Sequence, residues 1–491
     1  LEPFVYSARY ASGAALKTTA AQTATGKPIV EWQFSNDQKA ALLELLEKAD
    51  GTPVYATNIS IGRTYAMNDD IQGGKGQAVT MAEIKGASKP DERVIICAHV
   101  QEPGSNDNAT GVASLLGLAT ALKKMVDSGA IARPQRTITF LWGDEMNLAT
   151  LWLNSHPDEK AKVISALDMD MVGEDPDKTG GVMRIEKTPD PSAKYNYTLD
   201  TLPWETDSYY DETFADPDGQ FIRLPDSHTL WGAGSYEGMF QEGFFLNDLY
   251  MYAAQGVINY HDSGFRVDVC PYEGGSDHSR FLAQNVPALL TWHFTDYTYH
   301  SSVDTLNMSS AREMENVSIT TMATALMIAN ATDGNEALAL EILGTVMMAA
   351  LDRFDIEQAN TENHRIYTLA HGKDFAAALD NEKEVLQAWA DWYKEALASP
   401  AKYLLDAPSQ IFRDTQAQLL DLLDQRLELA LACADEYLQD EVTHTGLVKI
   451  DATAPTFSEP GNIEFWYCQN CGKLFADPQA TRELTEDDVL I

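Results

Sequence analysis

The pattern of apolar and polar positions predicts two kinds of region along this chain. Between residues 77 and 331, short continuous apolar runs alternate with longer amphipathic or small-residue segments. Short apolar runs bounded by polar residues are typical of strands buried on both faces, and their alternation with helices indicates a parallel sheet. Between residues 335 and 440, Ala, Leu and Glu recur at helical spacing, which predicts a group of long helices.

The predicted strands share a run of branched or aromatic residues that ends at a polar or glycine-containing loop. These strands are 54–61, 77–84, 94–97, 136–142, 163–167 and 288–294, and the helices predicted around them are 36–50, 108–127 and 311–331. We therefore predict an α/β fold, a three-layer sandwich with a central, mostly parallel mixed sheet. An α-helical C-terminal region and a small tail with a Cys-x-x-Cys motif follow it.

The changes in pattern divide the chain into four segments. They are an N-terminal arm (1–34), the α/β domain (35–332), the helical region (333–440) and the C-terminal tail (441–491). Residues 174–275 are acidic and aromatic and interrupt the alternation of strands and helices, so they form an insertion. A lid or wall over a site and a structural subdomain are both open interpretations of it. Within the helical region, Gly372, Pro400 and Pro408 are predicted to separate the helices.

Composition and charge narrow the classes of partner. The chain has 491 residues, of which 44% are hydrophobic, so it can form sizeable cores. Its 35 basic and 74 acidic residues give a net charge of −39. Such a surface repels nucleic acid and anionic membranes, so we expect neither as a partner. The longest apolar run, 342–351, is about half of the roughly 20 residues that span a bilayer, so we expect no membrane insertion.

The five cysteines fall into two groups. Cys97, Cys270 and Cys433 lie in apolar or mixed surroundings and are interpreted as core residues. Cys468 and Cys471 form a Cys-x-x-Cys motif, which is half of a zinc ribbon without a second pair. His444 as a third ligand, a disulfide, and a zinc ion shared with another chain all remain open. The Cys-x-x-Cys-Gly-Lys-x-Phe stretch resembles tails of bacterial cell-surface proteins, which implies an extracellular, cell-surface or periplasmic location.

Polar residues at the ends of the predicted strands carry the candidate chemistry. They are His99, Asp107, Asp144, Glu145, Asp170 and His300. In open α/β sheets, ligands and catalytic groups collect at the carboxyl ends of the strands. A mixed set of imidazoles and carboxylates suits zinc and, less selectively, manganese or cobalt. One carboxylate can bridge two ions about 3.5–4 Å apart, the spacing of hydrolytic two-metal sites.

Residues 35–330 resemble the di-zinc aminopeptidase family, which includes secreted bacterial leucine aminopeptidases, glutamate carboxypeptidases and glutaminyl cyclases. The resemblance rests on five ordered blocks, each at a predicted element boundary. They are Ala98-His99; Asn106-Asp107-Asn108-Ala109-Thr110-Gly111; Asp144-Glu145; Asp168-Met169-Asp170-Met171-Val172-Gly173; and Ser276-Asp277-His278 followed by Tyr299-His300 and Asp304-Thr305. It implies a zinc-dependent exopeptidase with a peptide substrate, most notably an aminopeptidase.

The resemblance also implies a role for each matching residue. Asp107 would bridge two zinc ions, with His99 and Asp170 completing one ion and Glu145 and His300 the other. Asp144, the residue before the glutamate ligand, would be the general base. It would accept the proton of the metal-bridging hydroxide that attacks the scissile carbonyl, and pass it to the leaving amine.

Two positions depart from the family pattern. The family has glutamate at the base position, so Asp144 is one methylene group short of the reach that a base needs. The family also has aspartate two residues after the first histidine ligand, whereas this chain has Gln101. A neutral amide supports the imidazole of His99 less well than a carboxylate would. The stretch after the glutamate pair, Met146-Asn147-Leu148, is altered as well.

Neighbouring polar residues have structural interpretations. Asp168 is predicted to support the site from the loop or from behind the ligands, and His278 to be a hydrogen-bonded structural histidine that Asp277 supports. Two alternative functions remain. A carboxypeptidase or dipeptidase of the same family would need a cation for the substrate carboxylate, for which Arg184, Arg223, Arg266 and Arg280 are candidates. A binding protein that keeps the fold with weakened catalysis is compatible with Asp144 and Gln101.

Overall fold

The computed structural model describes most of the chain from residue 79 onward. The described residues are 79–195, 223–226, 228–229, 231, 234–370, 375–439, 447–454, 461–468, 473–478 and 482–490, with the paired strands β1 (Ala15–Leu16) and β2 (Trp32–Gln33). The rest of the predicted arm, the elements predicted at 36–50 and 54–61, His444 and Cys471 lie outside them. The chain divides into unit 1 (Leu1–Asn360 with Glu384–Glu428) and unit 2 (Thr361–Lys383 with Leu429–Ile491).

A seven-stranded mixed sheet forms the centre of unit 1, with the strand order β3-β5-β4-β6-β9-β7-β8. Its strands are β3 (Thr80–Ile84), β4 (Lys89–His99), β5 (Arg136–Gly143), β6 (Val163–Met169), β7 (Val182–Glu186), β8 (Val267–Cys270) and β9 (Ala288–Phe294). The neighbours β5, β4, β6 and β9 are parallel, whereas β3 and β7 run antiparallel to the strands beside them in the centre. The predicted α/β fold with a mostly parallel mixed sheet is confirmed.

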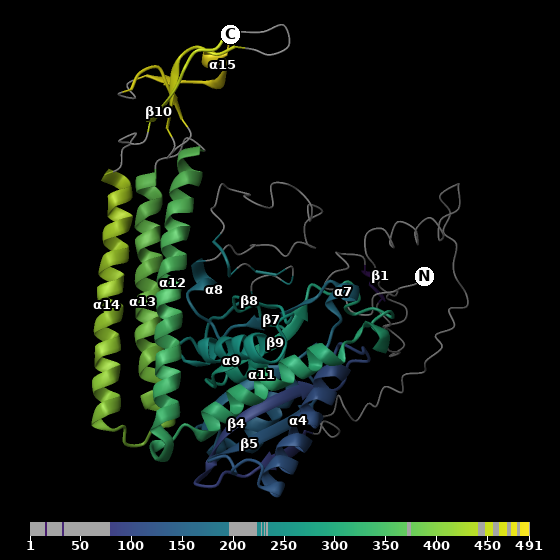
Figure 1. The fold of residues 1–491 in the computed structure, drawn as a ribbon. Coiled ribbons are helices and arrows are strands. Elements are labelled where there is room, and N and C mark those ends of the chain that lie inside the picture. Colours follow the sequence, from purple (N-terminus) through teal and green to yellow (C-terminus); the bar gives the residue numbers. More distant parts are fainter. Residues whose placement is uncertain are drawn as a thin grey trace, which may run out of the picture. The chain divides into compact units, whose positions relative to one another are not determined.

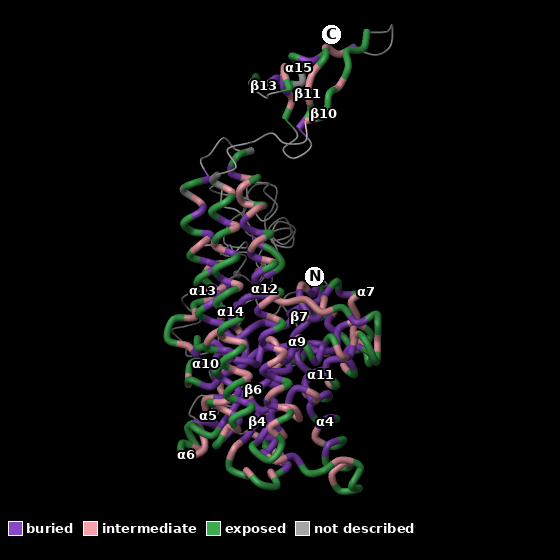
Figure 2. The backbone as a smooth tube through the Cα atoms, turned by 60° about the vertical axis from the view of Figure 1, so that its left-hand side comes forward, coloured by how far each residue is buried: buried purple, intermediate pink, exposed green. Residues whose placement is uncertain are grey.

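The parallel strands are long apolar runs because both faces of the sheet are covered by helices. All residues of β6 and β9 are buried, and Val94–Ala98 of β4 are fully shielded from solvent. Figure 2 shows this concentration of buried backbone around β4 and β6. The apolar run 94–97 is therefore the buried centre of a longer strand.

Helices cover both faces of the sheet. One layer contains α4 (Ala109–Ser128), α9 (Leu246–Tyr260) and α11 (Ala311–Asn330), which pack on one another and on the strands (Figure 1). The other contains α5 (Asn147–Ser155) and α10 (His278–Leu282). The chain passes from β4 through α4 to β5 and back through α5 to β6, and right-handed crossovers in opposite directions put the two helices on opposite faces.

The segment 174–275 is largely an integral part of this domain. It contains the short helices α7 (Pro176–Thr179) and α8 (Ser192–Tyr195), the core helix α9, and the strands β7 and β8. These two strands extend the central sheet, so the described part of the segment is structural, although Trp231 and Gly274 also line a pocket. Residues 196–222 lie outside the described part.

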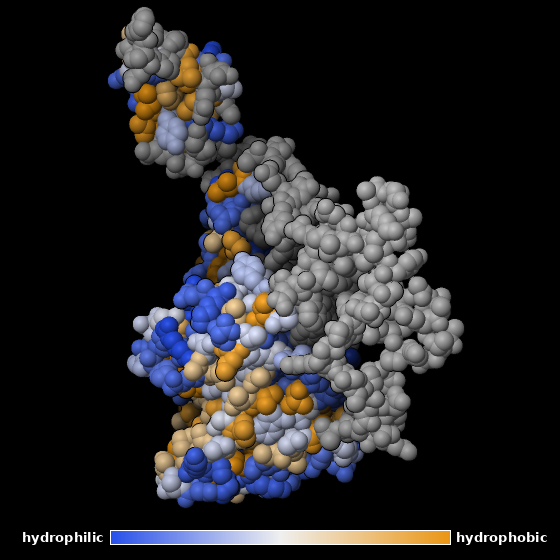
Figure 3. All heavy atoms as spheres, turned by 90° about the vertical axis from the view of Figure 1, so that its right-hand side faces the viewer, coloured by the Kyte–Doolittle hydropathy of each residue, from blue (hydrophilic) through white to orange (hydrophobic). Residues whose placement is uncertain are grey.

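Helix α4 is, among the described residues, the one helix long and apolar enough by length and composition to cross a membrane. Its buried residues include Leu115, Leu118 and Leu122, and the helix packs on the sheet and on α11. A core helix of an α/β domain has this composition because one face must be apolar. Figure 3 shows hydrophobic residues scattered among hydrophilic ones on one face of the molecule, a distribution that is normal for protein surfaces.

Three long helices form the helical region: α12 (Glu336–Ala370), α13 (Phe375–Leu404) and α14 (Gln410–Gln439). The prediction that Pro400 separates two helices is wrong, because Pro400 lies inside α13. Proline cannot donate to the carbonyl of Ala396, four residues earlier, and the hydroxyl of Ser399 donates to that carbonyl instead (2.7 Å). Pro408 does lie between two helices, α13 and α14.

Short elements complete the described structure. They are α6 (Pro157–Lys160), the 3₁₀ turns η3 (Leu306–Met308) and η4 (Asp333–Asn335), and α15 (Glu486–Val489). In unit 2, the strands β10 (Leu447–Ile450), β11 (Phe465–Cys468), β12 (Leu474–Phe475) and β13 (Glu483–Leu484) form an antiparallel sheet. Cys468 is buried in this sheet, and the roles open to the Cys-x-x-Cys motif remain predictions.

Candidate metal centre

The residues predicted to bind metal gather at one edge of the sheet. His99 ends β4, Asp170 follows β6 directly, Glu145 stands two residues after β5, and His300 lies in the loop after β9. Because β4, β5, β6 and β9 are parallel neighbours, their carboxyl ends meet at the same edge. Asp107 joins them from the loop between β4 and α4.

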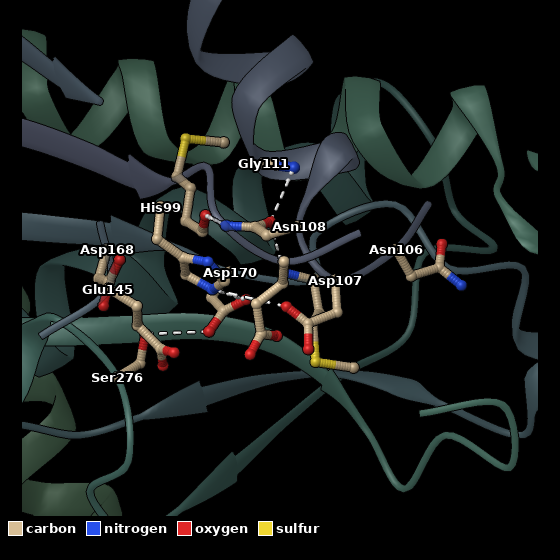
Figure 4. Close-up of polar contacts among 12 residues, drawn as sticks. His99, Asn106, Asp107, Asn108, Gly111, Glu145, Asp168, Asp170 and Ser276 are labelled. Carbon is tan, nitrogen blue, oxygen red and sulfur yellow. Dashed lines mark hydrogen bonds and ion pairs between the residues drawn. The ribbon is translucent and has the colours of Figure 1, made fainter. Parts of the chain in front are cut away.

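Asp107 lies between the two histidines. Its Oδ1 is 3.5 Å from Nε2 of His99, and its Oδ2 is 2.9 Å from Nε2 of His300. On the other side of the His99 ring, the same Nε2 is 3.0 Å from Oδ1 of Asp170. Figure 4 shows His99 with the side chains of Asp107, Asp170 and Glu145 around it. One carboxylate oxygen toward each imidazole is the arrangement that a bridging ligand requires.

Glu145 lies on the His99 side of the centre. One ligand atom each from His99, Glu145 and Asp170 lie within 4.8 Å of one another. Gln101 holds Glu145 with two hydrogen bonds: its Nε2 donates to Oε2 of Glu145 (3.1 Å), and its Oε1 accepts from the Glu145 amide (2.8 Å). The amide at position 101 therefore positions Glu145 instead of orienting the ring of His99.

The loop that carries Asp107 is held by Asp304. The carboxylate of Asp304 accepts from the backbone amides of Asn106 (2.8 Å) and Asp107 (3.1 Å). A Cβ atom at Gly104 would lie 2.1 Å from Oδ2 of Asp304, so this close approach requires glycine. On the other side of the loop, Asn108 caps α4, with its Oδ1 accepting from the amide of Gly111 (3.0 Å). The block around Asp304 thus fixes the backbone of the block that carries Asp107.

A second loop supports Asp170. Ser276 donates to Oδ2 of Asp170 (2.9 Å), as Figure 4 shows. The start of this loop is bound by Glu186 at the end of β7, whose Oε1 accepts from the amides of Glu273 (2.9 Å) and Gly274 (2.7 Å). Nε2 of His278 is 2.7 Å from the same oxygen. Glu186 thereby anchors both ends of the 273–278 loop.

His278 is the structural histidine that the sequence predicts, but its support differs from the prediction. Its amide donates to Asp168 (2.9 Å), and its ring binds Glu186. The predicted support from Asp277 is wrong, since both carboxylate oxygens of Asp277 are buried and make no hydrogen bond among the described residues. Asp168 lies within β6 behind the ligands, as predicted.

The ligands border a small pocket of about 230 Å³ with an apolar wall. Its lining comprises Glu102, Asp107, Glu145, Met146, Asp170, Met171, Trp231, Gly274, Gly275, Ser276, Leu290, Trp292, Tyr299 and His300. Trp231 packs edge-on against Trp292 and Tyr299, with ring centroids 6.2 Å apart in both pairs. The wall is therefore a packed aromatic cluster facing a row of acids, which is the mixture expected of a small-molecule or peptide-end site.

Three residues of the pocket rim have a left-handed backbone without being glycine. The φ angles are 63° at Met146, 56° at Met171 and 50° at His300. L-residues adopt this region at an energetic cost, and such residues concentrate at functional sites. Each follows a candidate ligand directly in the chain or is one itself, so the constraint orients the ligands.

Burial and crowding of like charge shift the pKa values of the centre. Burial raises the pKa of Glu145 to about 8, with Asp170 and Glu102 adding to the rise against the opposing effect of His99. Burial also raises the pKa of Asp107 well above its usual range. For His99, burial acts to lower the pKa, but Asp170 and the other nearby carboxylates outweigh it and raise the pKa to about 10. The side chains therefore hold protons that a metal ion would displace.

The donor set fits zinc. His99 and Asp107 are 1% and 2% exposed, yet Nε2 of His99, Oδ1 of Asp107 and Oδ1 of Asp170 make no hydrogen bond within the described part of the chain. Buried polar atoms without a hydrogen bond are costly and call for a partner such as an ion. Imidazole nitrogens and carboxylate oxygens are zinc ligands, and two such histidines with a shared carboxylate suit a pair of ions.

The structure places Asp144 beside the centre, at the start of α5. Its carboxylate accepts from Nδ2 of Asn147 (2.7 Å), and its carbonyl accepts from the amides of Asn147 and Leu148. Asp144 is half-buried and does not line the pocket. To reach a bound substrate, its carboxylate has to exchange the bond to Asn147 for one to the reacting group.

Sequence reasoning missed Glu102. Its carboxylate lies in the pocket, 3.3 Å from Nε2 of His300, and groups with His99 and Asp107 as a possible ligand. Its position in the sequence, as an acidic residue between His99 and Asp107, could have identified it as a candidate ligand. Trp231, distant in sequence, had no signal beyond the aromatic character of its segment.

Comparisons with known proteins found one family model and several solved structures that are similar to part of this chain. Residues 80–226 match the family model described as peptidase family M28. No curated protein matches. Among solved structures, the chain is similar to an aminopeptidase from Aneurinibacillus sp. strain AM-1 (21% identity, 51% of this chain and 47% of that one, TM-score 0.33). It is also similar to a zinc aminopeptidase from Bacillus subtilis (17%, 50% and 48%, 0.33) and a glutaminyl cyclase from an Acidobacteriales bacterium (15%, 52% and 74%, 0.31).

The chain spans about half the length of these two aminopeptidases. The family match covers the strands β3 to β7 with His99, Asp107, Glu145 and Asp170, and ends before His300. The match of residues 80–226 to the model of peptidase family M28 confirms the resemblance predicted from the five blocks, over less than half of the chain.

Proposed function

We propose that this protein is a zinc-dependent aminopeptidase, which removes N-terminal residues from peptides at the centre described above. The observation that carries the proposal is the charge of the pocket. Its lining contains four carboxylates and, among the described residues, no lysine or arginine. A carboxypeptidase or dipeptidase would need a cationic side chain here to hold a substrate carboxylate, whereas an aminopeptidase needs none.

The size of the pocket supports cleavage at a chain end. A volume of about 230 Å³ beside an aromatic wall matches the size of one terminal side chain. The substrate would place its terminal side chain against Trp231, Trp292 and Tyr299, and its amine near Glu145 and Asp170. The side chain is assigned to the aromatic wall because that wall is apolar, and the amine to the opposite wall because that wall is polar.

The residues divide the work as follows. His99, Asp107, Glu145, Asp170 and His300 would hold two zinc ions, which supply Lewis-acid polarisation of the scissile carbonyl and a water of lowered pKa when bound. Asp144 is the proposed general base, which takes a proton from the attacking water and returns it to the leaving amine. Gln101 and Ser276 position Glu145 and Asp170, respectively, and Asp304 positions the backbone of Asp107.

The alternative of a carboxypeptidase or dipeptidase has less support. Arg184 donates to the carbonyl of Phe294 and to Asp268, and Arg223 pairs with Glu357. Neither these two arginines nor Arg266 and Arg280 line the pocket. The four candidate cations named from the sequence are therefore not available to a substrate carboxylate there.

Three substrate classes test the proposal. The zinc-loaded protein is assayed with aminoacyl-nitroanilides, the same compounds with an acetylated amine, and peptides whose only free end is the carboxylate. Turnover of the first class alone, abolished by a chelator and by Glu145→Ala but kept by Glu237→Gln on the exposed surface, is expected. Equal turnover of the acetylated compounds would contradict an aminopeptidase, and no turnover with two bound ions would favour the binding-protein alternative.

Asp144 has its own test. Asp144→Glu adds the missing methylene group, so we expect kcat to stay equal or rise, whereas Asp144→Asn should lower kcat by about 100-fold or more because the base is lost. Similar kcat values for all three proteins would remove Asp144 from the mechanism.

A further inference from the structure

We propose that Glu102 is a metal ligand of this centre. It would supply, together with His300 and the shared Asp107, the carboxylate of the second ion, while Glu145 remains with His99 and Asp170 on the first. This inference rests on the two-metal site of the proposed function. It changes the assignment of Glu145 that the family pattern implies.

The position of Glu102 follows from a short connection. Only seven residues separate His99 at the end of β4 from Asp107, and Glu102 is the third residue of that connection. The hydrogen bonds of Asn106 and Asp107 to Asp304 pull the far end of the connection back over the sheet edge. The connection therefore turns tightly, and the side chain of Glu102 enters the pocket, where it is 18% exposed.

The distances fit one ion among three donors. Oε2 of Glu102 is 3.3 Å from Nε2 of His300, and Oδ2 of Asp107 is 2.9 Å from the same nitrogen. Donors bound at 2.0–2.1 Å in a tetrahedral zinc site lie about 3.3 Å from one another. A ligand atom of Glu102 is also within 4.8 Å of those of His99 and Asp107. Glu102 thus stands at ligand distance from His300 and from the shared carboxylate.

The second observation is the buried donor set that faces Glu102. Asp107 is 2% exposed, and its Oδ1 makes no hydrogen bond among the described residues. The ion pair of Glu102 within the described structure is with His300, and no lysine or arginine of the pocket neutralises it. Two carboxyl groups held this close either share a proton, as the hydrogen bond between Glu102 and Asp107 indicates, or bind a cation that displaces it, because two ionised groups would repel each other in a partly buried site.

Gln101 explains why Glu102 can take this place. The two hydrogen bonds from Gln101 hold Glu145 on the side of His99 and Asp170. The residue next to Gln101, Glu102, provides a second carboxylate beside His300 in addition to Asp107. The departure at position 101 and the additional acid at position 102 are two parts of one rearrangement. Four ionised carboxylates in the pocket also match the charge of two divalent ions.

Metal titration of the full chain tests the proposal without relying on catalysis. The protein is stripped with a chelator and titrated with zinc by calorimetry and with cobalt by visible absorption. Wild type and Glu237→Gln should bind two ions. Glu102→Gln should keep one ion and bind the other at least about 100-fold more weakly, since loss of a ligand exceeds the loss of a supporting group.

Double variants identify which ion is lost. Glu102→Gln combined with His300→Gln should still bind one ion, because both residues serve the same ion, whereas Glu102→Gln combined with His99→Gln should bind none. Circular dichroism of the metal-free proteins checks that Glu102→Gln is folded. Glu102→Asp keeps the charge, so it should retain part of the zinc affinity and serves as the second variant if Glu102→Gln folds poorly. Two ions bound by Glu102→Gln with wild-type affinity would overturn the assignment and leave the aminopeptidase proposal standing. A wild-type protein that binds no zinc would overturn both.

Discussion

Asp107 and Asp226 are both buried aspartates of unit 1, but the pKa of Asp107 is raised above its usual value and that of Asp226 is lowered. They are 2% and 0% exposed. Burial raises the pKa of Asp107, and nearby carboxylates add to the rise. Burial acts in the same direction on Asp226, but Arg353 and Lys187 outweigh it and lower the pKa below its usual value. Equal burial therefore gives opposite results because the neighbours differ.

Asp226 belongs to a buried network of ion pairs. Its members are Lys187, Asp190, Arg223, Asp226, Arg353 and Glu357. Lys187 is 2.6 Å from Asp190, Arg223 is 2.8 Å from Glu357, and the guanidinium of Arg353 also stacks 4.2 Å over the ring of Trp389. This ionic network supplies its own cations and joins the end of β7 to α12 and α13. The candidate metal centre combines carboxylates with imidazoles and, among its lining residues that the structure describes, contains no lysine or arginine.

The largest expected effect separates the two clusters by their response to zinc. Asp107→Asn should abolish activity, by about 1000-fold or more, and remove the stabilisation that zinc gives, which reaches about 4 kcal/mol at 1000 times Kd. Asp226→Asn should destabilise the protein equally with zinc and with chelator. Thermal unfolding of both variants in the two conditions measures this. Zinc-dependent stabilisation of Asp107→Asn equal to that of wild type would contradict the distinction.

The next effect concerns the ionic network alone. Arg353→Met removes one partner and leaves Asp226 and Glu357 buried with less compensation, which we expect to cost about 3–5 kcal/mol of unfolding free energy. Arg312→Met, at a pair whose arginine side chain is 57% exposed, is the matched control and should cost far less, because solvent screens an exposed pair. Urea unfolding in chelator gives both values. Similar costs for the two variants would mean that the buried network contributes no more than a surface pair.

The third effect is a pH dependence of stability that originates at His278, which is fully buried beside Asp168 and Glu186. Burial acts to lower its pKa, but Glu186 and Asp168 outweigh it and raise the pKa to about 9. The folded value exceeds the unfolded value of about 6.5, so the contribution to stability is complete below pH 6.5 and is lost as pH rises through 9. The loss is at most about 3 kcal/mol. Unfolding free energies of wild type should fall more steeply from pH 6.5 to 9 than those of His278→Asn, and parallel profiles would contradict this origin.

The smallest expected effect is at Asp304. Asp304→Asn weakens the acceptor for the amides of Asn106 and Asp107, and zinc affinity should fall by about 10–100-fold. Fold stability should change little, since the amide oxygen still accepts one hydrogen bond. Calorimetric titration with zinc measures the loss. An unchanged affinity would show that the loop is held without this carboxylate.

How far prediction from sequence succeeded depends on whether the signal was local. The apolar runs at 94–97, 163–167 and 288–294 predicted strands because burial on both faces leaves no choice of residue type. The antiparallel pairing of β7 with β9 could not be predicted, because the residue types of a five-residue strand do not indicate in which direction it runs in the sheet. Pro400 was misread because Ser399, next to it, satisfies the carbonyl that proline leaves free.

The sequence by itself determined that His99, Asp107, Glu145, Asp170 and His300 lie at one sheet edge, because each follows a strand and parallel strands end together. Only the tertiary structure decided which of them lie within ligand distance of one another. The paths of the loops set distances of about 3 Å between groups far apart in the chain. Those paths place Glu145 near His99 and Glu102 near His300. They also surround Asp107 with other carboxylates and Asp226 with Arg353 and Lys187, which is why the two pKa values differ.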